Sequence, residues 1–130
     1  MLQWKPLKKE AQAANEATDS KKAIRIEAFD KVEIKVAQIK SAGHVEGADK
    51  LLKFKLDDGS DVGRQILSGI AQWYPNPDEL VGKKVLIVAN LKPRKMRGEL
   101  SQGMLLSAEH DGKVQLVVVP DDLVNGSGVE

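Results

Sequence analysis

Apolar and polar residues alternate in several short segments of the chain after residue 24. Val32–Val36 and Leu52–Leu56 each place apolar residues at every second position, which is the pattern of a half-buried strand. Val85–Ala89 is apolar throughout and predicts a strand that is covered on both faces. Three further segments complete a set of six predicted strands: Arg64–Ile70, Gly103–Ala108 and Lys113–Val119.

Turn-forming residues separate most of these segments. Asp57–Ser60 and Asp111–Gly112 predict hairpin turns, because Asp and Gly accept the backbone angles that tight turns require. Asp78 is expected to cap a short helical turn that runs through Leu80 and ends at Gly82. Short strands joined by turns, without a long helix, predict an all-β domain in the form of a small closed barrel.

The first 23 residues have a different texture from the rest of the chain. They contain few large apolar residues and no clean helical stripe, which predicts a flexible linker or tail over residues 1–23. A short helix over Lys9–Ala17 is compatible with the Ala, Glu and Gln found there. We therefore expect the folded domain to occupy residues 24–130.

Composition removes several classes of function. The 130 residues include no cysteine, so disulfides, thiolate nucleophiles and cysteine-based zinc sites are excluded. His44 and His110 have no partner at a ligand-like spacing, and we expect neither a metal nor a cofactor. No apolar run of about 18 residues is present and the N-terminus lacks the apolar stretch of a signal peptide, which predicts a cytoplasmic protein without a membrane span.

Positive charge is concentrated in one segment, although the net charge of the chain is only +1. Residues 83–98 carry six Lys or Arg residues and no acid, and four of the six fall between Lys92 and Arg97. Such a density of cations indicates binding to phosphate groups of a nucleic acid. The alternative is a solvated charge run that keeps the protein soluble, but lysines that serve solubility are usually interspersed with acids.

The residues after the cationic segment extend the candidate interface. Ser101 and the backbone near Gly103 can donate hydrogen bonds to phosphate or ribose, and Met104 offers an apolar surface to a base or sugar. In the alternative interpretation Met104 belongs to the core and Ser101 to a turn. Aromatic residues make up only 4% of the chain, which favours recognition of backbone and shape over stacking on single-stranded bases.

No catalytic motif accompanies these features. The sequence lacks a phosphate-binding glycine loop, a zinc motif and a nucleophile elbow. The acid pairs Asp57–Asp58 and Asp121–Asp122 fall in predicted turns or near the C-terminus, where solvated carboxylates are expected. An active site built from carboxylates alone is the weaker alternative to a binding function.

Several linked motifs over residues 27–130 resemble the tRNA-binding domain family, and most closely the C-terminal domain that bacterial methionyl-tRNA synthetases carry. Their order along the chain is the one seen in that family. The motifs are Asp30–Ala37, Gly47–Leu51, Arg64–Ile70, Val88–Gly98 and Ser101–Met104.

The resemblance implies an oligonucleotide-binding (OB) fold, a five-stranded barrel with additional C-terminal strands. It also implies shape-dependent binding of tRNA, a homodimer formed through the C-terminal end, and the catalytic portion of a methionine-tRNA ligase as a partner, without catalysis by this chain itself. A free-standing tRNA-binding protein and a peptide-binding, export-chaperone-like protein of the same fold are the alternatives. The implied tRNA contacts are Asn90, Lys92, Arg94, Lys95, Arg97, Ser101 and Met104, with Lys35, Lys53 and Arg64 as flanking contacts.

Overall fold

The computed structural model describes residues 21–130 of the chain, which belong to two units with their boundary between Asp30 and Lys31. The first unit contains a four-residue helix, α2 (Ile26–Phe29), which ends where Asp30 N donates to Ile26 O at 2.9 Å. The helix expected over Lys9–Ala17 lies outside the described residues, as does most of the expected linker. The boundary between residues 23 and 24 therefore stays a prediction.

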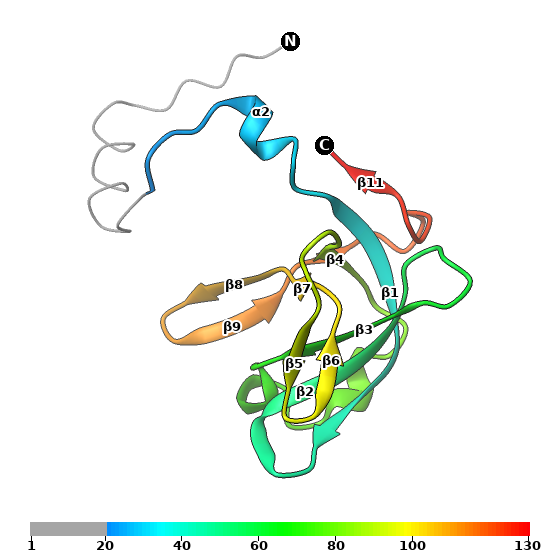
Figure 1. Ribbon diagram of the computed structural model, residues 1–130. Coiled ribbons are helices and arrows are strands. Elements are labelled where there is room, and N and C mark those ends of the chain that lie inside the picture. The colour runs from blue at the N-terminus through cyan, green and yellow to red at the C-terminus, as the bar shows by residue number, and fades with distance from the viewer. Residues whose placement is uncertain (1–20) are drawn as a thin grey trace. The chain divides into compact units, whose positions relative to one another are not determined.

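A seven-stranded antiparallel sheet forms the body of the second unit (Figure 1). Five strands follow one another in the order β10-β4-β1-β2-β3, while β11 also pairs with β1 and β7 also pairs with β4. The strands are β1 (Ile34–Val45), β2 (Ala48–Asp57), β3 (Arg64–Ser68), β4 (Lys84–Val88), β7 (Met104–Leu105), β10 (Val118–Val119) and β11 (Gly128–Val129).

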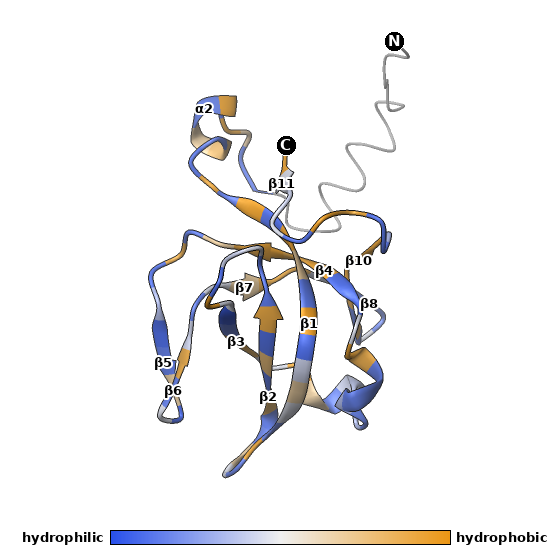
Figure 2. Cartoon of the chain, turned by 90° about the vertical axis from the view of Figure 1, so that its right-hand side faces the viewer, coloured by the Kyte–Doolittle hydropathy of each residue, from blue (hydrophilic) through white to orange (hydrophobic). Residues whose placement is uncertain are grey.

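Alternation along β2 determines which side of the sheet is buried. Leu52, Phe54 and Leu56 point into the core and are almost completely inaccessible, as the sequence predicts. Lys53 and Lys55 lie on the other face of the same strand, and Figure 2 shows this change of hydropathy from residue to residue. The outer face of β2 is consequently a cationic surface beside β3.

The core is built from aliphatic side chains of all the long strands. Ile39 of β1, Ile66 of β3 and Ile87 of β4 are each fully buried and pack around Phe54. In the apolar run Val85–Ala89, only Leu86 is more than slightly exposed, so the prediction of a strand covered on both faces is confirmed. Phe54 is the fully buried ring of this cluster, and the partly buried rings of Trp73 and Tyr74 pack against it.

The all-β fold of the OB type is confirmed, but the closed barrel is a wrong expectation. Within the described residues the strand order leaves β3 at an edge, without a continuous ladder that would close the sheet. Side chains occupy that edge instead: Gln102 Oε1 accepts from Gln65 N at 3.0 Å, and Ser101 Oγ accepts from Leu67 N at 3.0 Å. These oxygens stand where carbonyl groups of a further strand would be, and Gln102 N donates to Gln65 O at 2.7 Å.

Short elements complete the second unit. Two 3₁₀ helices, η1 (Ala71–Trp73) and η2 (Pro77–Leu80), connect β3 to β4. The expected cap at Asp78 is wrong, because η2 begins at Pro77, whose ring fixes the first backbone angle, and no side chain caps it.

Two hairpins extend from the sheet: β5 (Arg94–Met96) with β6 (Glu99–Ser101), and β8 (Ser107–His110) with β9 (Lys113–Leu116). Asp111 and Gly112 both have positive φ between β8 and β9, which confirms the predicted turn. The two C-terminal strands predicted from the sequence are each divided, into β7 and β8 and into β9 and β10.

Candidate nucleic-acid interface

The cationic segment folds as a hairpin. β5 and β6 are joined by only two residues, Arg97 with φ of 52° and Gly98 with φ of 80°. Positive φ at both positions is the type I′ turn, whose twist matches that of the strands it joins. Arginine is an unusual residue at the first of these positions, because its Cβ makes the left-handed conformation unfavourable.

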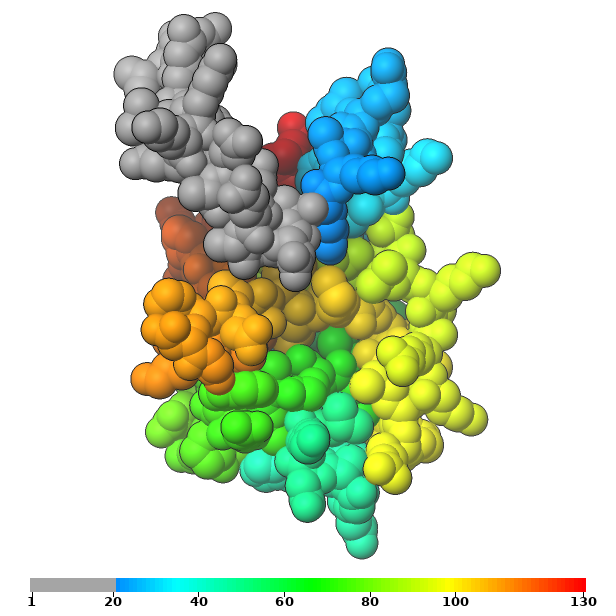
Figure 3. Space-filling model, turned by 90° about the vertical axis from the view of Figure 1, so that its left-hand side faces the viewer, coloured from blue at the N-terminus to red at the C-terminus, as the bar shows by residue number. Residues whose placement is uncertain are grey.

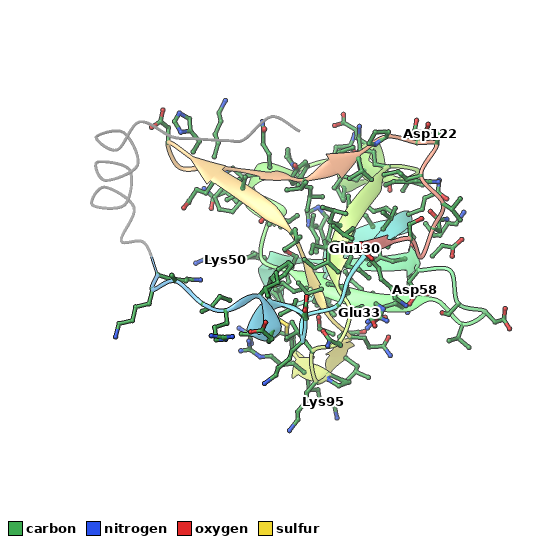
Figure 4. All side chains as sticks on the ribbon, turned by 90° about the horizontal axis from the view of Figure 1, so that it is seen from above. Glu33, Lys50, Asp58, Lys95, Asp122 and Glu130 are labelled. Atoms are coloured by element: carbon green, nitrogen blue, oxygen red, sulfur yellow. The ribbon has the colours of Figure 1, made fainter. Side chains whose placement is uncertain are left out.

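The register of the hairpin assigns its side chains to two faces. Arg94 lies opposite Ser101 and Met96 opposite Glu99, so these four share one face. We call the face with these four residues the inner face of the hairpin. Lys95 and its cross-strand neighbour Leu100 occupy the other face. Figure 4 shows the Lys95 side chain pointing away from the rest of the molecule, and Figure 3 shows long side chains projecting from this part of the surface.

The four cations of the hairpin segment are exposed and unneutralised. Lys92, Arg94, Lys95 and Arg97 are all exposed, and none of them takes part in an ion pair between residues of the described range 21–130. Positive groups at such a spacing repel one another until an anion approaches. The hairpin therefore presents a surface that favours the binding of phosphate groups.

A pocket of about 210 Å³ lies beside the inner face of the hairpin. Leu67 of β3 contributes to its wall together with residues from the segment 91–104. Four of the predicted contacts line this pocket, whereas Lys95 and Arg97 lie outside it. The lining residues are Leu67, Leu91, Lys92, Arg94, Met96, Ser101, Gly103 and Met104.

Ser101 and Met104 differ in what they offer to a ligand. Met104 is 47% exposed, which speaks against its being a core residue. The Ser101 side chain is buried, and its hydroxyl accepts from Leu67 N while donating to Gly103 O at 3.3 Å. In the free domain this hydroxyl thus holds β6 against β3, and a contact between Ser101 and RNA stays a prediction.

Arg64 ties together the two ends of the segment that carries the hairpin. Its Nη1 donates to Ala89 O and to Gln102 O, both at 2.7 Å, and its Nε lies 2.9 Å from Asp58 Oδ2. Gly103 lies next to the Arg64 guanidinium and has φ of 143°, and a Cβ there would lie 2.6 Å from Val88 O. Arg64 positions the hairpin, and its contact with RNA stays a prediction.

Burial of Asp58 opposes ionisation, but the surrounding donors more than compensate. The hydroxyl and amide of Ser60 and the guanidinium of Arg64 together lower the pKa of the Asp58 carboxyl to about 2. The pKa of Asp57 is also lowered, by a hydrogen bond from the Gly59 amide and another from the Asn125 side chain. Both carboxylates are fixed in structural hydrogen bonds, unlike the freely solvated acids expected from the sequence.

Asn90 performs a similar positioning role at the base of the hairpin. Its Nδ2 donates to Lys31 O at 2.6 Å, and its Oδ1 accepts from Glu33 N at 2.8 Å. The side chain thereby joins the end of β4 to the start of β1. Because the amide is exposed at this junction, a direct contact between Asn90 and RNA stays a prediction.

The two flanking lysines lie in different places. Lys53 Nζ is 3.3 Å from Glu99 Oε1, so it stands next to the inner face of the hairpin. Lys35 Nζ is 3.6 Å from Glu33 Oε1, and its strand neighbours are Ile87 and Gly128. The structure brings Lys53 to the hairpin but does not bring Lys35 to the pocket.

Sequence reasoning missed several residues of this interface. Leu91 and Met96 line the pocket, and the one local signal for them was their place beside cations, with Leu91 before Lys92 and Met96 between Lys95 and Arg97. Gln65 and Glu99 connect the hairpin to β3, with Gln65 Nε2 donating to Glu99 Oε2 at 3.1 Å. Nothing in the local sequence indicates that pairing, because 34 residues separate the two.

The polar atoms of two aromatic residues, Trp73 and Tyr74, have partners within the fold. Trp73 Nε1 donates to Gly112 O at 2.9 Å, and Tyr74 Oη accepts from Leu116 N at 2.9 Å. Both rings pack against the core under the β8–β9 hairpin. Their polar atoms serve the fold, which agrees with recognition of RNA by its backbone.

Two other kinds of site were sought in the described part of the chain. Residues 21–130 contain no group of three or more His, Asp or Glu side chains arranged to hold a metal ion. No helix described by the structure is both long and apolar enough to cross a membrane.

An OB-type fold with an exposed cationic hairpin defines a nucleic-acid-binding module. The chain belongs to the tRNA-binding domain family, since the family model described as "Putative tRNA binding domain" matches residues 34–128. The family is one of binding domains, and the resemblance inferred from the sequence is confirmed.

Individual relatives refine this assignment. The chain is 68% identical over 108 residues to a methionine–tRNA ligase of Lactiplantibacillus plantarum, a match covering 83% of this chain and 16% of the ligase. It thus corresponds to about one sixth of that relative, in the C-terminal region.

The chain is also similar in structure to solved proteins. A MetRS-related protein from Pyrococcus horikoshii superimposes with a TM-score of 0.79 at 40% identity, covering 85% of this chain and all of that one. A CsaA chaperone protein from Picrophilus torridus superimposes with a TM-score of 0.74 at 27% identity, covering 83% of this chain and all of that one.

Proposed function

We propose that the β5–β6 hairpin binds the ribose-phosphate backbone of folded tRNA, and that the chain serves as the accessory C-terminal domain of a methionyl-tRNA synthetase. In that role it holds tRNA for the catalytic portion and so supports aminoacylation in the cytoplasm. The observation that carries the proposal is the set of four exposed, unneutralised cations on the β5–β6 hairpin and directly before it. Its family and its similarity to methionine–tRNA ligases support tRNA as the target.

The two faces of the hairpin assign different parts to its cations. Lys92 and Arg94 stand at the pocket, where they hold phosphates while a ribose or base rests on Leu91 and Met104. Lys95 on the opposite face reaches further phosphates of the same folded RNA. Because the contacts are mostly electrostatic, affinity depends on the spacing of phosphates more than on base sequence.

Homodimerisation is part of the same proposal. Apolar side chains are exposed over the C-terminal region, with Val118 at 51%, Leu123 at 38% and Val124 at 72%. Exposed apolar residues that gather in one region often mark an interface. A dimer that covers these side chains would offer two hairpins to one RNA molecule. The molar mass in solution tests the dimer directly. We expect the mass of two chains, and the mass of a single chain at micromolar concentration would contradict the dimer.

A titration with tRNA at several salt concentrations tests the binding function. If all four cations contact phosphates, the logarithm of the association constant should fall with the logarithm of salt concentration with a slope of about −3 to −4. A slope near zero, or no binding at low salt, would contradict the proposal. Because the chain covers only a small part of the ligases, the same titration should be repeated with the complete synthetase.

A peptide-binding function is the second candidate, favoured by the structural similarity to the CsaA chaperone protein and by the apolar residues of the pocket. In that case unfolded polypeptide would occupy the pocket and compete with tRNA. The competition separates the two functions: we expect tRNA to remain bound when excess unfolded polypeptide is added, and displacement of the tRNA would favour the chaperone.

A further inference from the structure

Glu99 is the only acid between residues 83 and 108, and it faces inward from the cationic hairpin. Both of its carboxylate oxygens are engaged: Oε1 lies 3.3 Å from Lys53 Nζ, and Oε2 accepts from Gln65 Nε2 at 3.1 Å. Gln65 Oε1 in turn accepts a hydrogen bond from Lys55. One lysine and one amide of the sheet thus hold the single carboxylate supplied by the hairpin, and Lys55 supports that amide from behind.

The sheet positions these partners independently of Glu99. Lys53 lies opposite Leu67 and Lys55 opposite Gln65 across the β2–β3 pair, and all four side chains point to the outer face. Leu67 also belongs to the pocket at the hairpin. We call Lys53 and Gln65, which hold Glu99, the cradle. This cradle is therefore continuous with the surface that we assign to tRNA.

The hairpin does not depend on this carboxylate for its attachment. Ser101 Oγ and Gln102 Oε1 accept hydrogen bonds from the β3 edge, and Gln65 Nε2 also donates to Leu100 O at 2.9 Å. The Lys53 and Glu99 side chains are each 35% exposed. An ion pair at that exposure contributes little to stability, so separating it costs little.

We propose that Glu99 occupies, in the free domain, the place of an RNA phosphate, and that a backbone phosphate of bound tRNA displaces it from Lys53 and Gln65. This proposal rests on the tRNA-binding function proposed above. The exchange replaces one anion by another on the same donors. Glu99 thereby keeps the cradle neutralised in the absence of RNA and lowers the affinity for anions that cannot displace it.

Removing the charge of Glu99 while keeping its shape tests the exchange. Glu99→Gln retains an oxygen that can accept from Gln65, and it leaves Lys53 free for a phosphate without competition. We expect tRNA affinity at low salt to rise about two- to fivefold, since an exposed pair of this kind is worth at most about 1 kcal/mol. The salt dependence should steepen by up to about 0.9, the contribution of one phosphate.

Two further variants make the test specific. Glu109→Gln removes an exposed acid from the separate β8–β9 hairpin and measures the general effect of net charge. In a Lys53→Gln background, the gain from Glu99→Gln should shrink to that of Glu109→Gln. The proposal is overturned if Glu99→Gln gains no more than Glu109→Gln, if it loses affinity while remaining folded, or if its gain persists without Lys53.

The outcome is separable from that of the proposed function. Replacing Lys92, Arg94 and Lys95 tests the hairpin as the binding surface, whereas the Glu99 and Lys53 variants test only the exchange. A Lys53-dependent gain in a protein whose hairpin cations prove dispensable would support the exchange and reject the hairpin. If the hairpin variant loses tRNA affinity but Glu99→Gln gains none, the result would support the hairpin as the binding surface and reject the exchange.

Discussion

The Arg64 guanidinium and the Asp58 carboxylate form a nearly buried ion pair, with 2.9 Å between Nε and Oδ2. Arg64 also binds the carbonyls of Ala89 and Gln102, so the pair lies at the base of the segment that carries the hairpin. Asp58 is therefore connected to the candidate interface although it is not part of it. The loop containing Asp58 and the segment that carries the β5–β6 hairpin are thus held by the same arginine.

Lowering the pH should reduce the free energy of unfolding, because Asp58 becomes protonated. Its pKa is about 2 in the folded protein against 3.8 for an ordinary Asp, so the folded state binds the proton less tightly than the unfolded state. The resulting stabilisation is present above about pH 5 and is lost as pH falls through 3.8 towards 2, with an upper limit of about 2 kcal/mol. Urea unfolding between pH 7 and about pH 2 measures it.

Asp58→Asn should destabilise the protein at pH 7 and flatten this pH dependence, because the titrating group is gone. Asp61→Asn, in the exposed part of the same loop, is the matched control and should leave the pH profile unchanged. A profile of Asp58→Asn that parallels the wild type would show that other carboxylates cause the acid sensitivity.

Ser101→Ala should lower the free energy of unfolding, because the Ser101 hydroxyl is part of the fold. The substitution leaves the buried Leu67 amide without its acceptor, and an unsatisfied buried donor costs about 1–3 kcal/mol. Urea unfolding at pH 7 gives the loss, and Ser107→Ala on the exposed strand β8 should change the unfolding free energy by less than about 0.5 kcal/mol. Equal, small effects for both variants would mean that Ser101 does not hold the β3 edge.

Arg97→Asn should separate stability from affinity. Asn accepts the positive φ of this turn more readily than Arg, so the unfolding free energy should stay constant or rise by up to about 1 kcal/mol. Affinity for tRNA should nevertheless fall, because one exposed cation is lost from the hairpin. The paired measurements are urea unfolding and a tRNA titration at constant salt.

Asp111→Asn provides the control for that change. Asp111 occupies the same position in the β8–β9 turn, with φ of 51°, but it carries no positive charge. Asn there should not lower tRNA affinity. If Arg97→Asn binds tRNA as well as the wild type does, the tip of the β5–β6 hairpin is not part of the interface.

Periodic and turn signals predicted the sheet well, because they depend on local chemistry. The apolar side of Leu52–Leu56 is buried as expected, and Asp111–Gly112 forms the expected turn. The β5–β6 hairpin gave no such signal, since its strands do not alternate and Arg–Gly is not a usual type I′ pair. Tertiary hydrogen bonds from β3 attach it to the sheet.

The candidate site was predictable in charge but not in geometry. Lys92, Arg94, Lys95 and Arg97 are exposed as a binding segment requires, yet only the strand register shows that Arg94 and Lys95 face opposite ways. The engagement of Ser101 with Leu67 and of Lys53 with Glu99 joins residues 34 and 46 positions apart. Such pairings are properties of the folded chain, and residue spacing does not reveal them.

The most direct test of the account compares two triple variants in a tRNA titration over a range of salt concentrations. One replaces Lys92, Arg94 and Lys95 with Gln; the other replaces exposed lysines away from the hairpin, Lys50, Lys83 and Lys113, and so has the same net charge. The hairpin variant should lose affinity strongly, and its salt slope should become shallower by about 2 to 3 while the control stays close to the wild type. Equal losses in the two variants, with both still folded, would contradict the assignment of the hairpin as the tRNA-binding surface.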